Sequence, residues 1–101
     1  MSHGRQTLGA TPVLDIGGEV GALLVYLAAV PPGGELEACP ADRPDARFHT
    51  GVHLRRNGAA EVAVAVFPEV REGRYTLLDE SLSALASVDV TGGAVAELDL
   101  R

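Results

Sequence analysis

Hydrophobic and polar positions alternate along much of the chain after Pro12, with the period of two that β-strands produce. The alternation is clearest in residues 95–100, where Leu98 lies between Glu97 and Asp99. An apolar side chain at every second position can face a core while the carboxylates between face water. The pattern therefore predicts a chain built mainly of short strands.

Turn residues divide the chain into short runs, and two pairs of runs are predicted to form β-hairpins. The pairs are residues 87–90 with 95–100, joined by Gly92-Gly93, and residues 48–55 with 61–67, joined by Asn57-Gly58. In residues 61–67 both alternating faces are apolar. A strand of this kind is predicted to be central in the sheet or to be covered by a partner.

Three further runs are predicted as strands. Residues 73–77 would direct Tyr75 and Leu77 inward, and residues 33–39 would do so with Leu36 and Ala38. Residues 19–30 fit either a strand or a helix, because a run of eleven apolar residues does not distinguish the two periods. We favour a strand through Leu23, Val25 and Leu27, since the run ends in two prolines without a helix cap.

Together these elements predict an all-β fold: a mostly antiparallel sandwich of about seven strands, similar to prealbumin or immunoglobulin domains. Residues 12–101 would form this single domain, because 101 residues are too few for two ordinary ones. Residues 1–11 are polar, contain glycine and lack a period, so they are expected to form a disordered leader.

A resemblance to a known family supports this prediction in the last third of the chain. Residues 66–77, Val-Phe-Pro-Glu-Val-Arg-Glu-Gly-Arg-Tyr-Thr-Leu, followed by Val-Asp-Val-Thr-Gly-Gly at 88–93 and the run at 95–100, resemble prealbumin-like β-sandwich domains. Carboxypeptidase regulatory-like and Cna B-type repeats belong to that family. The resemblance implies a binding, spacing or regulatory module rather than a particular activity. The opening Val-Leu-Asp-Ile-Gly-Gly also resembles small proteins of high-GC bacteria, which implies no known chemistry.

Composition and charge narrow the expected partners. The chain is 47% hydrophobic with a net charge of −6, and all eight basic residues are arginine. Nucleic acid and anionic membranes bind clustered cations, so neither is expected as a partner. The longest apolar run has eleven residues, fewer than the roughly 20 that span a bilayer. The start lacks an apolar signal region and Cys39 is the single cysteine, so we expect a cytoplasmic location.

The segment Val13–Gly21 also resembles the glycine loop of S-adenosylmethionine-dependent methyltransferases. That loop joins a strand to a helix in a larger alternating fold. Here Glu19 occupies the central glycine position, and the chain is about half the length such a domain needs. A strand end with a tight Gly17-Gly18 turn is the favoured interpretation, and no cofactor is expected.

Two histidines raise the alternative of a metal or small-ligand site. His49 and His53 share one face of a predicted strand, but four residues at about 3.3 Å each separate them by roughly 13 Å. A chelate would therefore need further partners, and the candidates are Asp42 and Asp45 in the preceding loop, His3 in the leader or Glu61 across the hairpin. The alternative is that both histidines are strand residues exposed to solvent that bind no ligand.

No complete catalytic set is present in the sequence. Cys39 could meet a histidine and an aspartate in space, but a lone cysteine before a proline more often fills a strand end. Our leading hypothesis is therefore a non-enzymatic module that binds a protein partner or itself. Its predicted interface residues come from two apolar segments: Leu23, Val25, Leu27, Ala63, Ala65 and Phe67.

Overall fold

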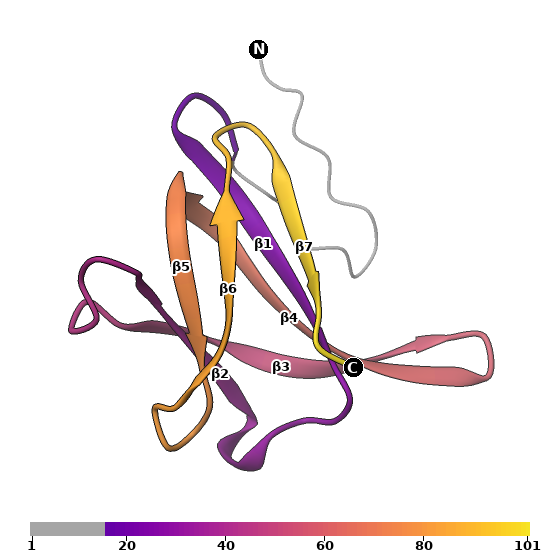
Figure 1. Ribbon diagram of the computed structural model, residues 1–101. Helices are drawn as coiled ribbons and strands as arrows, with labels where there is room; N and C mark the ends of the chain where they lie inside the picture. The colour runs from indigo at the N-terminus through magenta and orange to yellow at the C-terminus, as the bar shows by residue number, and fades with distance from the viewer. Residues whose placement is uncertain (1–15) are drawn as a thin grey trace.

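The computed structural model describes residues 16–101, and the predicted leader at residues 1–11 lies outside this range (Figure 1). Seven strands make up most of the described chain. They are β1 (Val20–Leu27), β2 (Glu35–Pro40), β3 (Phe48–Asn57), β4 (Ala60–Arg71), β5 (Gly73–Leu78), β6 (Ala84–Val90) and β7 (Val95–Asp99). One short 3-10 turn, η1 (Pro32–Gly34), precedes β2. The fold is all-β, as the alternation predicts.

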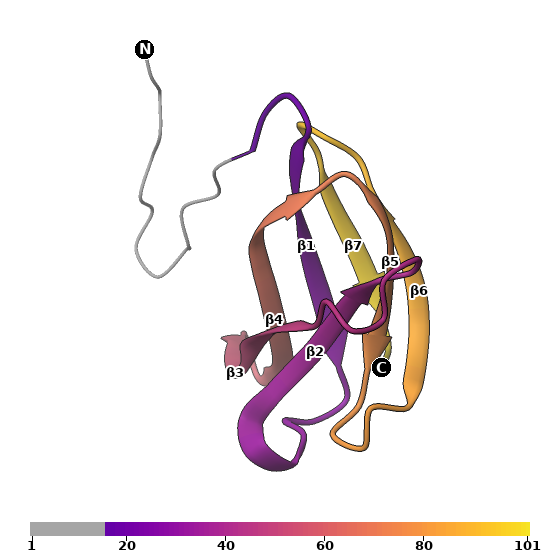
Figure 2. The same ribbon diagram turned by 90° about the vertical axis from the view of Figure 1, so that its left-hand side faces the viewer.

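The strands form one sheet in the order β6-β5-β2-β3-β4-β1-β7 (Figures 1 and 2). All neighbouring pairs are antiparallel except β1 and β7, which run parallel. The ambiguous segment at 19–30 contains the strand β1, hydrogen-bonded between β4 and β7. Pairing on both sides satisfies its backbone groups, so this leucine-rich segment is a strand despite its helix-compatible composition.

The sheet has two halves, β6-β5-β2 and β4-β1-β7, and β3 pairs with both of them. Because β3 joins the halves, one half folds over the other and their inner faces meet. Its first residues, 48–51, pair with β2, whereas residues 52–57 pair with β4. Side chains from both halves meet in one apolar core. Its largest fully buried side chains are Leu23, Val25 and Leu77, each at most 1% exposed.

Three of the four aromatic side chains lie where the two halves meet. The Phe48 ring packs edge-on against Phe67, with centroids 5.5 Å apart, and against Tyr75 at 5.8 Å. Tyr75 and Leu77 on β5, and Leu36 and Ala38 on β2, face the core as the alternation predicts. Edge-on contacts between three rings from three strands fix how β3 crosses between the halves.

The hairpin predicted at Asn57-Gly58 is present, because β3 and β4 pair in register from Val52 with Ala65 to Asn57 with Ala60. Gly58 at the tip has φ of +67°, which glycine adopts at little cost.

The hairpin predicted at Gly92-Gly93 is wrong. The two runs that flank it are both strands, but β6 pairs with β5 and β7 pairs in parallel with β1. Figure 1 shows their connecting turn at one end and the two strands diverging from it. Period-two alternation identifies a strand without identifying its neighbour, and here the turn crosses from one edge of the sheet to the other. It packs against the start of β1, so closely that a Cβ on Gly92 would collide with the Gly18 carbonyl oxygen.

Within residues 16–101, no helix has the length and apolar character required to cross a membrane.

Candidate functional site

The residues predicted to form an interface are placed in the core. Leu23 and Val25 of β1 and Ala63, Ala65 and Phe67 of β4 are each at most 3% exposed, and Leu27 packs against them. Cross-strand register explains why they share a face, since Leu23 lies opposite Phe67 and Val25 opposite Ala65. These side chains are covered by the chain itself and do not present a surface to a partner.

The opposite face of the same strands is also apolar, and it faces outward. Leu24 and Tyr26 of β1 lie beside Val62, Val64 and Val66 of β4, with Leu24 opposite Val66 and Tyr26 opposite Val64. We call these five residues the outer apolar stripe. Val64 is 9% exposed and the other four are half-buried, so neighbouring side chains cover the stripe only in part.

The side chains that border the stripe differ between its two sides: a histidine and an arginine lie on one side, and two carboxylates lie on the other. On the β3 side, His53 lies opposite Val64 and Arg55 opposite Val62. On the β7 side, Glu97 lies beside Leu24 and Asp99 beside Tyr26. One row across the sheet therefore reads His53, Val64, Tyr26, Asp99. We call the stripe and these two borders together the outer face.

A hollow of about 310 Å³ lies on the β3 side of the outer face. Its lining residues are Thr50, Gly51, His53, Arg55, Val64, Val66 and Pro68, without a carboxylate among them. Gly51 contributes no side chain, and a Cβ there would lie 3.1 Å from the His53 Nε2 atom. The hollow therefore combines an apolar wall with one arginine and one histidine, in a chain whose net charge is −6.

The acidic border is tied together by Tyr26 and Arg101. The Tyr26 hydroxyl donates to a Glu97 carboxylate oxygen at 3.3 Å, and the Arg101 guanidinium lies 5.3 Å from the centre of the Tyr26 ring. Arg101 also donates to both Asp99 carboxylate oxygens, at 2.9 and 2.8 Å. These hydrogen bonds lower the pKa of Asp99 to about 2, so the Asp99 carboxylate stays charged in mildly acidic solution. Desolvation and the nearby Glu97 carboxylate raise the pKa of Tyr26.

The predicted metal ligands do not come together. His49 and His53 point to the outside of β3 and are exposed, while Asp42 and Asp45 lie in the exposed loop between β2 and β3. The partner of His49 is Glu35, with His49 Nε2 3.5 Å from the carboxylate oxygen. Across residues 16–101, no three histidine, cysteine or acidic side chains are grouped to hold a metal ion.

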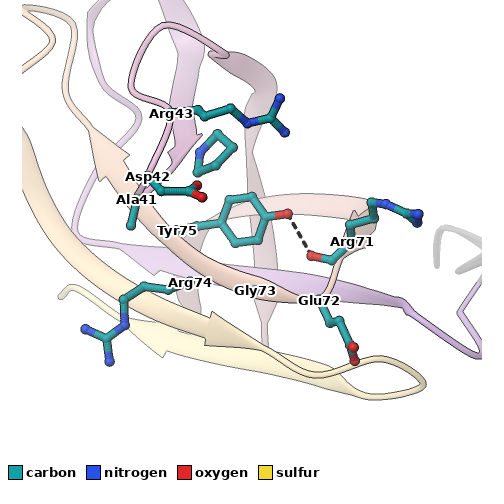
Figure 3. A pocket seen from close by; sticks show the side chains of 9 residues that line it. Ala41, Asp42, Arg43, Arg71, Glu72, Gly73, Arg74 and Tyr75 are labelled. Atoms are coloured by element: carbon teal, nitrogen blue, oxygen red, sulfur yellow. Dashed lines mark hydrogen bonds between the residues drawn. The ribbon is translucent and has the colours of Figure 1, made fainter.

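Asp42 instead lines a second hollow, of about 410 Å³, between the β2–β3 loop and the turn that joins β4 to β5 (Figure 3). Tyr75 lies at its centre and donates a 2.7 Å hydrogen bond to the Arg71 carbonyl oxygen. Burial is the main cause that raises the pKa of Tyr75. Figure 3 shows the side chains of Arg43, Arg71 and Arg74 spreading away from the ring in different directions. Their guanidinium groups do not converge on one position where an anion could bind.

Two further sequence features have structural roles in the described chain. Cys39 is 3% exposed within β2, as expected of a cysteine that fills a strand end. Gly17 and Gly18 form a turn that leads into strand β1, whereas the glycine loop of a methyltransferase leads into a helix. Val13, Leu14 and Asp15 of that loop lie outside the described residues.

Comparison with known proteins finds no matching family model, no similar curated protein and no similar solved structure. The outer face is therefore interpreted from its own geometry. Sequence reasoning named His53, as a metal ligand, and missed the other residues of the outer face, although one signal pointed to them: residues 61–67 are apolar at both alternating sets of positions. One set forms the core, and the other forms the stripe.

Proposed function

We propose that this chain is a non-enzymatic module that self-associates through its outer face. The observation that carries the proposal is the outer apolar stripe, which the chain covers only in part although its strands are the middle strands of their half of the sheet. Outward-facing positions of antiparallel sheets are usually polar when they face water. A stripe of three valines, a leucine and a tyrosine is typical of a surface that a partner covers.

The size of the face predicts weak association. Four strands about 4.8 Å apart and five residues at about 3.3 Å each cover roughly 300 Å² in projection. Stable complexes bury about 800 Å² per partner, so this face belongs with transient contacts. We expect a monomer in dilute solution and a dimer at high micromolar to millimolar concentration.

A concentration series measured by sedimentation equilibrium tests the proposal. The mass of the full chain should rise from that of a monomer towards that of a dimer. Val66→Lys places a charge in the middle of the stripe and should abolish the rise, and Leu24→Lys should do the same. Circular dichroism of each variant tests whether it is folded. If one of the two variants is unfolded, the other is sufficient for the test.

Ser87→Lys provides the matched control, because Ser87 is exposed on the edge strand β6, away from the outer face. It should associate as the wild type does. A wild-type chain that stays monomeric at millimolar concentration overturns the proposal. Association that Ser87→Lys abolishes and Val66→Lys leaves intact also overturns it, since that result indicates pairing of sheet edges.

A further inference from the structure

We infer that the partner on the outer face is a second copy of this chain, related by a two-fold axis parallel to the strands, with Glu97 of one copy entering the Gly51 hollow of the other. This inference rests on the proposed function and specifies its geometry. It follows from the order of charges across the sheet.

The borders of the outer face are complementary to each other. Arg55 and His53 lie on β3, and Glu97 and Asp99 lie two strands away on β7, beyond β4 and β1. When two such faces stack about an axis parallel to the strands and between β4 and β1, β3 of each copy faces β7 of the other. Arg55 and His53 of each copy then meet Glu97 and Asp99 of the other, with Asp99 already paired to Arg101, and the apolar stripes meet in the middle.

The alternative axis, perpendicular to the strands, is unfavourable. It would stack β3 on β3 and β7 on β7, so that the two borders with Arg55 face each other and the two borders with Glu97 and Asp99 face each other. Like charges opposite each other in a partly desolvated contact oppose association. The charge order therefore selects one of the two face-to-face arrangements.

Register along the strands then brings Glu97 to the hollow. Glu97 of β7 is the register partner of Leu24, and Leu24 is the register partner of Val66 on β4. On the other side of β4, Ala65 pairs with Val52, so the next residue, Val66, is level with Gly51. Gly51 of β3 is thus on the same row as Glu97. Packed sheets cross at about 30°, which shifts the borders by about one residue and keeps the carboxylate between Gly51 and Arg55.

The hollow has the chemistry to receive a carboxylate. Gly51 has no side chain, and the edge of the His53 ring lies over it, so a carboxylate that enters the hollow meets the His53 ring with Arg55 beside it. One Glu97 oxygen accepts the hydrogen bond from Tyr26, and the second oxygen is left to accept a hydrogen bond from the partner. Arg55 forms no ion pair with any residue in the range 16–101.

Charge reversal tests the orientation. Arg55→Glu and Glu97→Arg should each weaken self-association about three- to tenfold, the range expected of rim ion pairs. The double variant restores opposite charges at each border and should recover wild-type affinity to within about twofold. A double variant that remains as weak as the single variants indicates that like borders meet, and overturns the inference.

Cysteine cross-linking tests the contact directly. Gly51→Cys protein mixed with Glu97→Cys protein should form heterodimers cross-linked by a bis-maleimide reagent that spans about 10 Å, the separation of packed sheets, whereas each protein alone should not. Two copies of residue 51 would lie about 17 Å apart, because about 14 Å across the strands combines with about 10 Å between the packed sheets, and this distance exceeds the span of the reagent. The native Cys39 is buried and does not compete.

The outcomes separate this inference from the proposed function. Self-association that Val66→Lys abolishes, without 51-to-97 cross-links and without rescue in the double variant, leaves the proposed function standing and rejects the two-fold arrangement. A monomer under all conditions rejects both. Nuclear Overhauser contacts between residues 1–15 and Leu24 within a monomer would also reject both, because the chain would then cover its own outer face.

Discussion

The two faces of β1 and β4 are made of similar residues but have different surroundings. Leu23 and Leu24 are neighbours on one strand, yet Leu23 is buried under the other half of the sheet and Leu24 is only half-covered. Across the sheet, Phe67 lies beside Leu23 and Val66 beside Leu24. Hydrophobicity alone therefore does not decide which face becomes the core.

The two faces differ in the side chains that the other strands place around them. On the inside, β2, β5 and β6 add Leu36, Leu77 and Val90 to the same core. On the outside, β3 and β7 border the stripe with charged side chains, which no fully buried surface tolerates. The inner face thus stabilises the fold, whereas the outer face can accept a partner that carries matching charges.

The largest expected difference is between alanine substitutions at the two leucines. Leu23→Ala should lower the free energy of unfolding by about 3 kcal/mol, because it leaves a cavity in the core. For a chain of this length, that loss lowers the melting temperature by about 12 to 20 °C. Leu24→Ala should cost less than about 1 kcal/mol. Thermal unfolding at low protein concentration measures both, and equal losses would show that the outer face is as well packed as the inner one.

Two strand glycines extend the comparison to the backbone. A Cβ on Gly21, on the inner side of β1, would collide with the carbonyl oxygens of Thr91 and Ala94. Gly21→Ala should therefore destabilise the chain by about 2 to 3 kcal/mol. On the outer face, a Cβ on Gly51 would meet only the tip of the His53 ring, which can move.

Gly51→Ala is thus the matched control for Gly21→Ala. It should change the free energy of unfolding by less than about 1 kcal/mol, and it can be stabilising because alanine restricts the unfolded chain. Urea unfolding of both variants gives the two values. A Gly21→Ala variant as stable as the wild type would mean that the turn between β6 and β7 is not held against β1.

The alternation of apolar residues predicted the strands other than β1, because each strand of the described chain has one face in the core, whereas β1 was favoured as a strand from the prolines that follow it. It predicted the inward positions of Tyr75 and Leu77 and the β3–β4 hairpin. It failed for the connection between β6 and β7, because alternation in residues 95–100 is satisfied equally by pairing with β6 or with β1. Long-range pairing depends on the whole sheet rather than on a local turn.

The candidate site was harder to predict for a related reason. In residues 61–67 either set of alternating positions could be the core, so the interface was assigned to the set that proves to be buried. The charged borders are separated in sequence by more than forty residues and meet only through the order β3-β4-β1-β7. The metal hypothesis lacked the same information, since Glu35 rather than Asp42 lies beside His49.

The two tyrosines give a smaller contrast between the faces. The Tyr75 hydroxyl supplies the Arg71 carbonyl oxygen with a hydrogen bond in a part-buried site. Tyr75→Phe should therefore cost about 1 kcal/mol. Tyr26→Phe removes an exposed hydrogen bond to Glu97 and should cost at most a few tenths of a kcal/mol. Chemical unfolding measures both, and a larger loss for Tyr26→Phe would contradict the assignment of the faces.

The smallest effect concerns the acidic border of the outer face, and its direct measurement is a titration. Hydrogen bonds from Arg101 lower the pKa of Asp99 from 3.8 to about 2, so the folded chain binds this proton less readily than the unfolded chain does. The contribution of Asp99 to stability is therefore complete above about pH 4 and is lost as the pH falls towards 2. Carboxyl carbon NMR should give an Asp99 midpoint near 2, and Arg101→Ala should return the midpoint towards 3.8. A wild-type midpoint near 3.8 would show that Arg101 does not hold the Asp99 carboxylate in solution, and the acidic border would then be less ordered than the core-facing side of the same strand.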